Sequence, residues 1–425
     1  MENCAHALPW LMAIFCAGYL AIIFEHYIRV NKTAIAILTA IACWSLYILC
    51  SGFPLSQDLH KLNEDVSNVA QVIFFLLGAM TIVEIIDSHR GFAIVTDIVT
   101  TTSKRKLYWI ISIVSFFLSA VLDNLTTTIL MLSILKKIMP HREDRISIAC
   151  LVVIAANAGG AWTPIGDVTT TMLWISGQIT TFAIMKSLFI PSLISLFVPL
   201  VLLSWNVRGK IVKTQESAAA LKAEPGAKLV FTAGILGLVF IPFFKALTGL
   251  PPFMGAIFSL AILWLITDLK HHRHDKRSHL RIPHILTKID TSSVLFFLGI
   301  LLAVAALDSA GILISFANFL NTTFSSQAVI ATIIGVISAI IDNVPLVAAT
   351  IGMYPLDTYP PDSPLWKMIA YAAGTGGSLF IIGSAAGVAM MSIEKMDFIS
   401  YMKKVTFPAF LGYLAGMVAY LAMQA

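Results

Sequence analysis

Charged side chains are scarce in this chain, and their scarcity excludes an ordinary soluble fold. Only 12% of the 425 residues are charged, 58% are hydrophobic, and the mean hydropathy is +0.87. Apolar runs of about 17 to 22 residues, long enough to cross a bilayer, recur along the whole chain. A soluble core cannot hide that much apolar surface. The composition predicts an all-α polytopic membrane protein.

Cysteine is scarce as well, and no two cysteines have the CxxC spacing of a metal or redox site. The five cysteines lie in or beside apolar runs, where each serves as a small apolar residue. Lys and Arg are absent before the first apolar run, 9–28, which follows Glu2 and has no small-residue cleavage signal. This run is expected to be a retained span instead of a secretory peptide. The net charge of +5 then marks cytoplasmic loops and not a nucleic-acid surface.

Hydropathy predicts ten full membrane crossings. With the basic loops placed in the cytoplasm, both chain termini are expected on the outer side. The predicted crossings are residues 9–28, 34–50, 68–86, 146–176, 187–205, 229–247, 253–268, 291–307, 366–392 and 405–423.

Two further apolar stretches carry the related patterns SAVLDN and SAIIDN. The first pattern ends at Asp123-Asn124 within 107–139, and the second ends at Asp342-Asn343 within 327–356. A charge at membrane depth costs several kcal/mol and is kept mainly for function. The duplicated acid and amide therefore predict a two-fold site for a cation.

Both stretches are predicted to be re-entrant helical hairpins. Basic residues flank 107–139 at both ends, so both ends are expected in the cytoplasm, with the turn at Asp123-Asn124. No Lys or Arg lies near either end of 327–356, so the second hairpin is expected to enter from outside.

The two halves of the chain repeat one another at a nearly constant offset. The two hairpin aspartates are 342 − 123 = 219 residues apart, and Gly159-Gly160 recurs 217 residues later as Gly376-Gly377. Five crossings per half is an odd number, so the second half is expected to lie inverted in the membrane, as in secondary transporters. We predict two inverted repeats, each with five transmembrane helices, a re-entrant hairpin and a broken helix. Their bounds are 1–212 and 228–425, with a cytoplasmic linker at 213–227.

The span after each hairpin is interrupted by glycines. Residues 157–167 hold three glycines and a proline, and residues 374–387 are equally rich in glycine, which a continuous helix disfavours. Unwound backbone at membrane depth is tolerated where it lines a cavity, and its carbonyl groups can bind a small cation. Further neutral oxygens come from Asn157, Thr163, Thr375 and Ser378.

Structural roles stay open beside the functional ones. Each glycine pair also permits close helix packing. Asp123 and Asp342 also suit the N-cap of a returning helix. Asp167, two residues before Thr169, is equally a helix cap or a ligand. Because Asn or Ser would cap without a charge, two hairpin aspartates indicate that the charge itself is required.

Three further features carry titratable side chains. Glu84 and Asp87 lie three residues apart on one helix face near the cytoplasmic end of their span. Asp87 is expected to pair with His89 or Arg90, whereas the deeper Glu84 is a candidate proton way-station. The loop His271–His279 has the composition of a metal site or pH sensor, but its basic neighbours favour a solvated cytoplasmic loop.

These motifs resemble those of the NhaD-type sodium/proton antiporters, within the ion-transporter superfamily of arsenite pumps and dicarboxylate carriers. The resemblance spans nearly the whole chain and is carried by Ser119–Thr128, Asn157–Thr171 and Ser338–Ala349. Dicarboxylate carriers of the superfamily have Ser-Asn-Thr at the hairpin tips, where this chain has Asp123 and Asp342. The resemblance implies exchange of Na⁺, and also Li⁺, for H⁺ without a cofactor. The membrane would be a bacterial inner membrane, with an organellar envelope as the alternative.

In this interpretation one site holds either a metal ion or protons. Burial favours the neutral form of a carboxyl group, whereas bound sodium favours the charged form. Asp123 and Asp342 are the expected Na⁺ ligands and proton carriers, Glu84 and Asp87 the candidate proton pathway. The expected partners are the lipid bilayer and small cations, not nucleic acid, and a homodimer stays open. The candidate cation- and proton-binding residues are Asp123, Asn124, Thr126, Asn157, Thr163, Asp167, Thr169, Asp342, Asn343, Thr375 and Ser378.

Two other functions compete with cation exchange. The first is transport of arsenite, another oxyanion or a carboxylate on the same fold, although two fixed negative charges oppose an anionic substrate. The second is an intramembrane aspartyl protease using Asp167, which leaves the duplicated hairpins without a purpose.

Overall fold

The computed structural model describes residues 2–93, 101–139, 141–205, 207–210, 224, 226–271, 280–324 and 326–424. Over these ranges the chain folds into helices joined by turns, without a β-strand, which confirms the all-α class. Eight of the described helices are long and apolar enough to cross a membrane individually. Most of the predicted linker and residues 272–279 of the histidine-rich loop lie outside the described residues.

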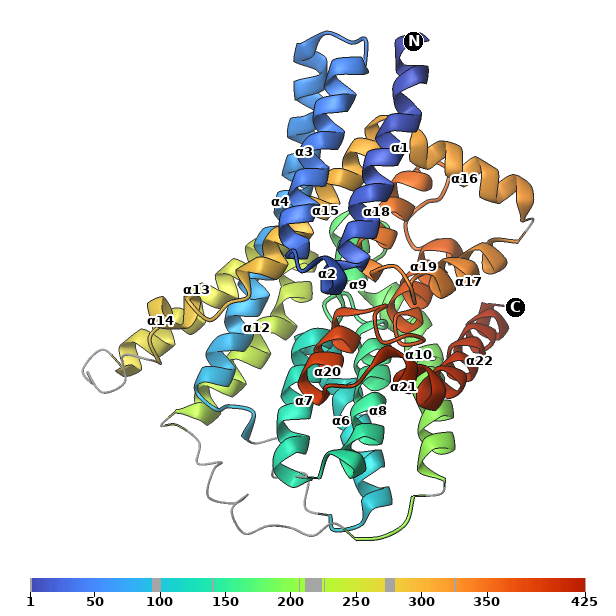
Figure 1. Cartoon of the computed structure of the whole chain (residues 1–425). Coiled ribbons are helices and arrows are strands. Elements are labelled where there is room, and N and C mark those ends of the chain that lie inside the picture. The colour runs from blue at the N-terminus through green and yellow to red at the C-terminus, as the bar shows by residue number, and fades with distance from the viewer. Residues whose placement is uncertain are drawn as a thin grey trace.

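The first half begins with long helices and continues with paired shorter ones (Figure 1). Its helices are α1 (Glu2–Ile23), α2 (Glu25–Ile28), α3 (Lys32–Cys50), α4 (Leu55–Ser88), α6 (Lys104–Leu122), α7 (Asn124–Ile138), α8 (Arg142–Gly160), α9 (Val168–Ile175) and α10 (Thr181–Ser204).

The second half follows a similar order. Its helices are α12 (Ala227–Thr248), α13 (Pro252–His271), α14 (Ile282–Leu286), α15 (Thr291–Ser309), α16 (Ile312–Thr323), α17 (Gln327–Ile337), α18 (Asn343–Met353), α19 (Pro364–Gly376), α20 (Ala385–Glu394), α21 (Phe398–Tyr401), a π-helical turn (Met402–Thr406) and α22 (Phe407–Gln424).

The predicted crossing at 68–86 is the later part of a much longer helix. Helix α4 has 34 residues and is about 50 Å long, well over the thickness of a hydrocarbon core. The segment 51–67 was expected to be an outer loop, but residues from Leu55 onward are helical. Hydropathy did not predict this part of α4 because residues 55–67 are mostly polar. Hydropathy did not predict α16 either.

Both predicted hairpin turns lie at their aspartates. Helix α6 ends at Leu122 and α7 begins at Asn124, so Asp123 is the single residue between two packed helices. In the second hairpin α17 ends at Ile337, and a turn over 338–342 leads into α18.

Both predicted helix breaks are present, and the glycine pairs explain how each break packs. A Cβ atom on Gly159 would clash with the carbonyl oxygen of Phe116 in α6, and one on Gly376 would clash with that of Gly335 in α17. The next glycine of each pair faces its own break, because a Cβ on Gly160 would meet the backbone of Gly166. Each glycine pair therefore allows close helix packing through its first glycine and accommodates the helix break through its second.

The first broken helix consists of α8 and α9, and the second consists of α19 and α20. The two broken helices contact each other at both ends. At one end the buried Arg145 of α8 donates to both carboxylate oxygens of Glu394 at the end of α20, each at 2.8 Å. At the other end Asp362, before α19, accepts from the backbone and hydroxyl of Thr180, both at 2.7 Å. The start of each broken helix thus meets the end of the other.

The long helices of the two halves pack against one another around this centre. Helix α3 packs on α15, α4 packs on α13, and α10 packs on α22. In Figure 1, α1, α3 and the start of α4 extend to one end of the molecule, and α6, α7 and α8 extend to the other. The arrangement places the hairpin tips and helix breaks in the interior.

Candidate functional site

The first hairpin tip presents a carboxylate held by the helix that follows it. Asp123 Oδ1 accepts from the backbone N–H of Thr126 at 2.7 Å, and Oδ2 accepts from the Thr126 hydroxyl at 2.8 Å. Asp123 is therefore the N-cap of α7, as the sequence suggested. Its backbone has φ 95° and ψ 161°, a conformation that is normally restricted to glycine.

The neighbouring amide joins the hairpin to the first broken helix. The side chain Nδ2 of Asn124 donates to Asn157 Oδ1 at 3.0 Å and to Asp167 Oδ2 at 2.7 Å. All three side chains are buried. The other oxygen of Asp167 accepts from the backbone N–H and hydroxyl of Thr169, both at 2.8 Å. Asp167 is therefore a helix cap and a member of the polar cluster at the same time.

Asn157 connects this cluster to the second half of the chain. Its Nδ2 donates to Ser378 Oγ and to Ser384 Oγ, each at 2.9 Å. Ser384 caps α20 and stands 217 residues after Asp167, so it is the sequence counterpart of that aspartate. The sequence analysis did not select Ser384, although this offset would have found it.

The second hairpin tip is held less tightly than the first. Asp342 Oδ1 accepts from the backbone N–H of Val344 at 3.1 Å and so caps α18. Its own backbone N–H donates to the hydroxyl of Tyr19 at 3.0 Å. Within the described part of the chain, Nδ2 of the buried Asn343 has no hydrogen-bond partner. The two tips therefore differ in how their polar groups are satisfied.

Two predicted hydroxyl ligands are used inside the protein instead. The Thr163 hydroxyl donates to the carbonyl of Ala120 in the first hairpin at 2.7 Å. The Thr375 hydroxyl donates to the carbonyl of Tyr371 within its own helix. Each of these hydroxyls still has lone pairs to offer, but its proton is committed to the fold.

One polar cluster joins the first hairpin tip to both broken helices. Asp167 is bound to that tip through Asn124, and Asn157 links the same cluster to Ser378 and Ser384 of the second half. Over the described ranges, no three His, Cys, Asp or Glu side chains lie close enough to form a metal site of their own. The cluster therefore combines carboxylates with amide, hydroxyl and backbone oxygens, which is a donor set suited to a weakly held hard cation.

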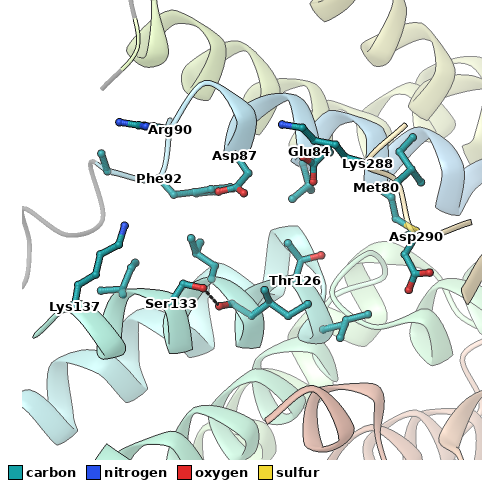
Figure 2. A pocket seen from close by; sticks show the side chains of 17 residues that line it. Met80, Glu84, Asp87, Arg90, Phe92, Thr126, Ser133, Lys137, Lys288 and Asp290 are labelled. Atoms are coloured by element: carbon teal, nitrogen blue, oxygen red, sulfur yellow. Dashed lines mark hydrogen bonds between the residues drawn. The ribbon is translucent and has the colours of Figure 1, made fainter. Parts of the chain in front are cut away.

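A cavity of about 480 Å³ leads toward the first tip (Figure 2). It lies between α4 and α7 and is lined by both predicted pathway residues, Glu84 and Asp87, and by Thr126, which holds Asp123. Glu84 accepts from Ser88 at 3.1 Å, and Ser88 in turn accepts from Lys288 at 3.0 Å. Glu84 and Asp87 therefore share a cavity with Thr126, the residue whose backbone N–H and hydroxyl hold Asp123.

The expected pairing of Asp87 with His89 or Arg90 stays a prediction. Asp87 lines the cavity together with Arg90, Lys137 and Lys288 (Figure 2). His89 is buried, and its Nε2 lies 3.1 Å from Nε2 of His271. His271 was expected in a solvated loop, but it ends α13 in the interior because this contact buries it.

A second cavity, of about 320 Å³, lies on the far part of α4. Its lining includes Asp65 of α4, Asp308 of α15, and Ala348 and Gly352 of the second hairpin. The sequence analysis did not single out this pair of aspartates. Each hairpin's returning helix therefore borders a cavity of its own, and the two cavities meet α4 at different levels, around residues 65–72 and 80–87.

The fold and this cluster define a polytopic membrane transporter with a polar centre built from two hairpins and two broken helices. The model of the citrate transporter family, CitMHS, matches residues 19–374, and the chain belongs to that family.

Similar proteins are known from plants and bacteria. The chain is 52% identical to Sodium/proton antiporter 1 of Arabidopsis thaliana over 97% of this chain and 72% of that protein. It is 50% identical to Sodium/proton antiporter 2 of the same plant, over 97% and 98% of the two chains. It is 28% identical to the Na⁺/H⁺ antiporter NhaD of Vibrio cholerae, over 97% and 91%. The predicted resemblance to NhaD-type antiporters is confirmed.

Proposed function

We propose that this protein exchanges Na⁺, and also Li⁺, for H⁺ across a membrane. The observation that carries the proposal is the buried polar cluster in which Asn124 of the first hairpin tip binds Asp167 and Asn157, and Asn157 binds Ser378 and Ser384 of the second half. The names of the relatives agree with it, because both plant proteins and the Vibrio cholerae protein are named as sodium/proton antiporters.

Competition at the aspartates of this site couples the two ions. A carboxylate held among apolar segments is costly in its charged state, and either a proton or a metal cation relieves that cost. In the proposed cycle, Na⁺ binding displaces protons and proton binding displaces Na⁺. Asn124, Asn157 and Ser378 would supply neutral oxygens once their mutual hydrogen bonds rearrange around the ion. Thr126 and Thr169 hold the carboxylates in place.

The cavity between α4 and α7 is the proposed route to Asp123. Glu84 and Asp87 line it, and Thr126 forms its inner wall. Water in this cavity and the two acidic side chains would carry protons or sodium between solvent and the tip. The second cavity supports a matching route on the other side, as alternating access requires.

We further infer that the halves are inverted repeats, with bounds 1–212 and 228–425. Support comes from the matched contacts of Gly159 with Phe116 and of Gly376 with Gly335, which recur at offsets of 217 and 219 residues. The contacts between the two broken helices support the same relation. In each contact, the start of one broken helix meets the end of the other.

Transport of a citrate-like anion is the second candidate, because the matching family model is described as a citrate transporter. Three aspartates at the centre oppose it, since a tricarboxylate would have to enter a region that is already anionic. Arsenite, which enters as a neutral hydroxide, stays an alternative outcome of the transport assay.

The membrane in which the protein resides is inferred from the organisms of its relatives. The expectation of a bacterial inner membrane has little support from them, because the two half-identical relatives are plant proteins, whereas the bacterial relative from Vibrio cholerae is 28% identical. We propose an organellar envelope of a plant-type cell. Fluorescent fusions expressed in such cells would test the location.

The transport assay uses inverted vesicles that contain the protein. A pH gradient is first established, and its dissipation is recorded on adding NaCl, LiCl, KCl, citrate or arsenite. Rapid dissipation with Na⁺ and Li⁺ is expected, without a response to citrate or arsenite. Full activity in both Asp123→Asn and Asp342→Asn would refute the proposed mechanism.

A further inference from the structure

The unwound backbone between α19 and α20 is held by the segment that follows α20. The hydroxyl of the fully buried Tyr401 donates to the carbonyl of Ser378 at 2.8 Å. The hydroxyl of Thr406 donates to the next carbonyl along the chain, that of Leu379, at 2.6 Å. Two consecutive carbonyl groups of the second helix break are therefore fixed by hydroxyls of one segment.

A third contact to the same part of the break comes from α21. The ring of Phe398 lies against the ring of Phe380, the residue after Leu379, with centroids 5.7 Å apart. The residues held in this way begin with Ser378, whose side chain accepts from Asn157 of the first half at 2.9 Å. The segment after α20 therefore positions a member of the polar cluster that joins the two halves.

The π-helical turn Met402–Thr406 brings the two hydroxyl groups to one side of this segment. In an α-helix, with 3.6 residues per turn, side chains five positions apart point in directions about 140° apart. In a π-helix the backbone hydrogen bonds join residues i and i+5, so residues five positions apart lie on one face. Tyr401 directly precedes the turn, and Thr406, five positions later, ends it. The wider turn therefore directs both side chains toward the same stretch of backbone.

The two halves hold their helix breaks in different ways. In the first half the break meets α10 through the rings of Trp162 and Phe189, 4.9 Å apart, and α10 is an α-helix over Thr181–Ser204. In the second half Pro408 follows the π-helical turn by two residues. It has no N–H to donate to the carbonyl of Lys404, and its ring crowds that carbonyl, which favours a departure from the α-helix.

We infer that Tyr401 and Thr406 are positioning residues for the transported cation, because they fix the second break so that Ser378 offers its oxygens to Na⁺. This inference rests on the proposed Na⁺/H⁺ exchange. A ligand that is already held in place loses less conformational freedom when the ion binds. Protons bind to the aspartates and not to the neutral oxygens of Ser378. The two hydroxyl contacts therefore strengthen Na⁺ binding and leave proton binding unchanged.

The test measures the Na⁺ concentration dependence of exchange in inverted vesicles for Tyr401→Phe and Thr406→Val. Each substitution removes one hydroxyl and nearly keeps the shape of the side chain. Each is expected to raise the KM for Na⁺ roughly threefold, because the break loses one of its two hydrogen bonds. Thr406→Ser keeps the hydroxyl and should stay near the native KM. At saturating Na⁺, the pH dependence of exchange in Tyr401→Phe should equal that of the native protein.

A matched control separates positioning from the general loss of a buried hydroxyl. The hydroxyl of the buried Tyr420 bonds to the carbonyl of Pro364, outside the break, so Tyr420→Phe should keep the native KM. Melting temperatures are recorded for all variants. A purely structural role would reduce the amount of folded protein and the maximal rate, and would leave the KM unchanged.

Two results would overturn the inference. One is a KM for Tyr401→Phe and Thr406→Val equal to that of Tyr420→Phe, and the other is a shifted pH dependence of Tyr401→Phe at saturating Na⁺. If Tyr401→Phe does not accumulate, the comparison of Thr406→Val with Thr406→Ser decides in the same way. Absence of Na⁺-dependent exchange in the native protein would instead reject the proposed function.

Discussion

At the scale of single residues, Asp123 combines a strained backbone with a carboxylate that caps α7. Its backbone angles lie in a region that costs a non-glycine residue about 1–3 kcal/mol. Asp342 has φ −50° and carries no such strain. A strained non-glycine residue at the first tip supports the proposal that its carboxylate takes part in exchange.

This difference predicts opposite stability orders at the two tips. Asp123→Gly should be more stable than Asp123→Ala by about 1 kcal/mol, because both lose the cap and only glycine relieves the strain. At residue 342 the alanine variant should be the more stable of the two, since glycine only adds freedom to the unfolded chain. Melting temperatures in detergent would measure both orders. The same order at both positions would contradict the assigned strain.

The sequence predicted most members of the buried polar cluster, because polar groups within apolar runs leave a visible pattern. Asp123, Asn124, Asn157 and Asp167 stand out as polar residues within apolar runs, and the structure brings them together. Tyr19 could not be predicted in this way, because a tyrosine in a membrane span is common and its contact depends on how α1 packs.

At the scale of elements, the hairpin turns and helix breaks were predictable because their causes are local. An aspartate N-cap and a cluster of glycines act within a few residues. The length of α4 and the existence of α16 were not predictable from hydropathy. Residues 55–67 are polar but helical, and α16 has only 12 residues, too few for a span.

Close packing at the broken helices predicts a strong effect of one added methyl group. Gly159→Ala and Gly376→Ala should each destabilise the protein by about 1–3 kcal/mol and reduce exchange, because the new Cβ meets backbone atoms of the adjoining hairpin. Gly237→Ala is the control, since its Cβ would meet the side chain of Ser259 at 3.1 Å and a backbone atom of Ser259 only at 4.0 Å. Melting temperature and Na⁺-dependent exchange would be measured together. If Gly159→Ala behaves like Gly237→Ala, the hairpin does not pack as described.

At the scale of the whole molecule, the halves are joined by buried contacts that no single segment reveals. The ion pair between Arg145 and Glu394 spans 249 residues of sequence and has side-chain exposures of 8% and 0%. Such pairings depend on the complete fold, so the sequence analysis had no local signal for them.

Removing one member of this ion pair should lower the stability of the folded protein. Arg145→Met leaves the Glu394 carboxylate buried without its partner and should destabilise the protein by about 3–5 kcal/mol. The double variant Arg145→Met/Glu394→Met should recover much of that loss. Melting temperatures of the single and double variants provide the measurement. A double variant as unstable as the single one would show that the pair has another role.

The proposed inverted arrangement predicts opposite sidedness for two engineered cysteines. In a variant without native cysteines, Ser217→Cys in the linker should react with an impermeant maleimide from the cytoplasmic side only. Asp357→Cys, on the exposed loop after α18, should react from the opposite side only, because three crossings separate the two positions. Labelling of both from one side would contradict the predicted topology.

The central claim is that cation and protons compete for one group of carboxylates. Its most direct measurement is the number of protons released when Na⁺ binds to the purified protein in weakly buffered solution. The account predicts release of about one proton or more per Na⁺ bound near neutral pH, and loss of that release in Asp123→Asn/Asp342→Asn. Saturable Na⁺ binding without proton release would contradict it.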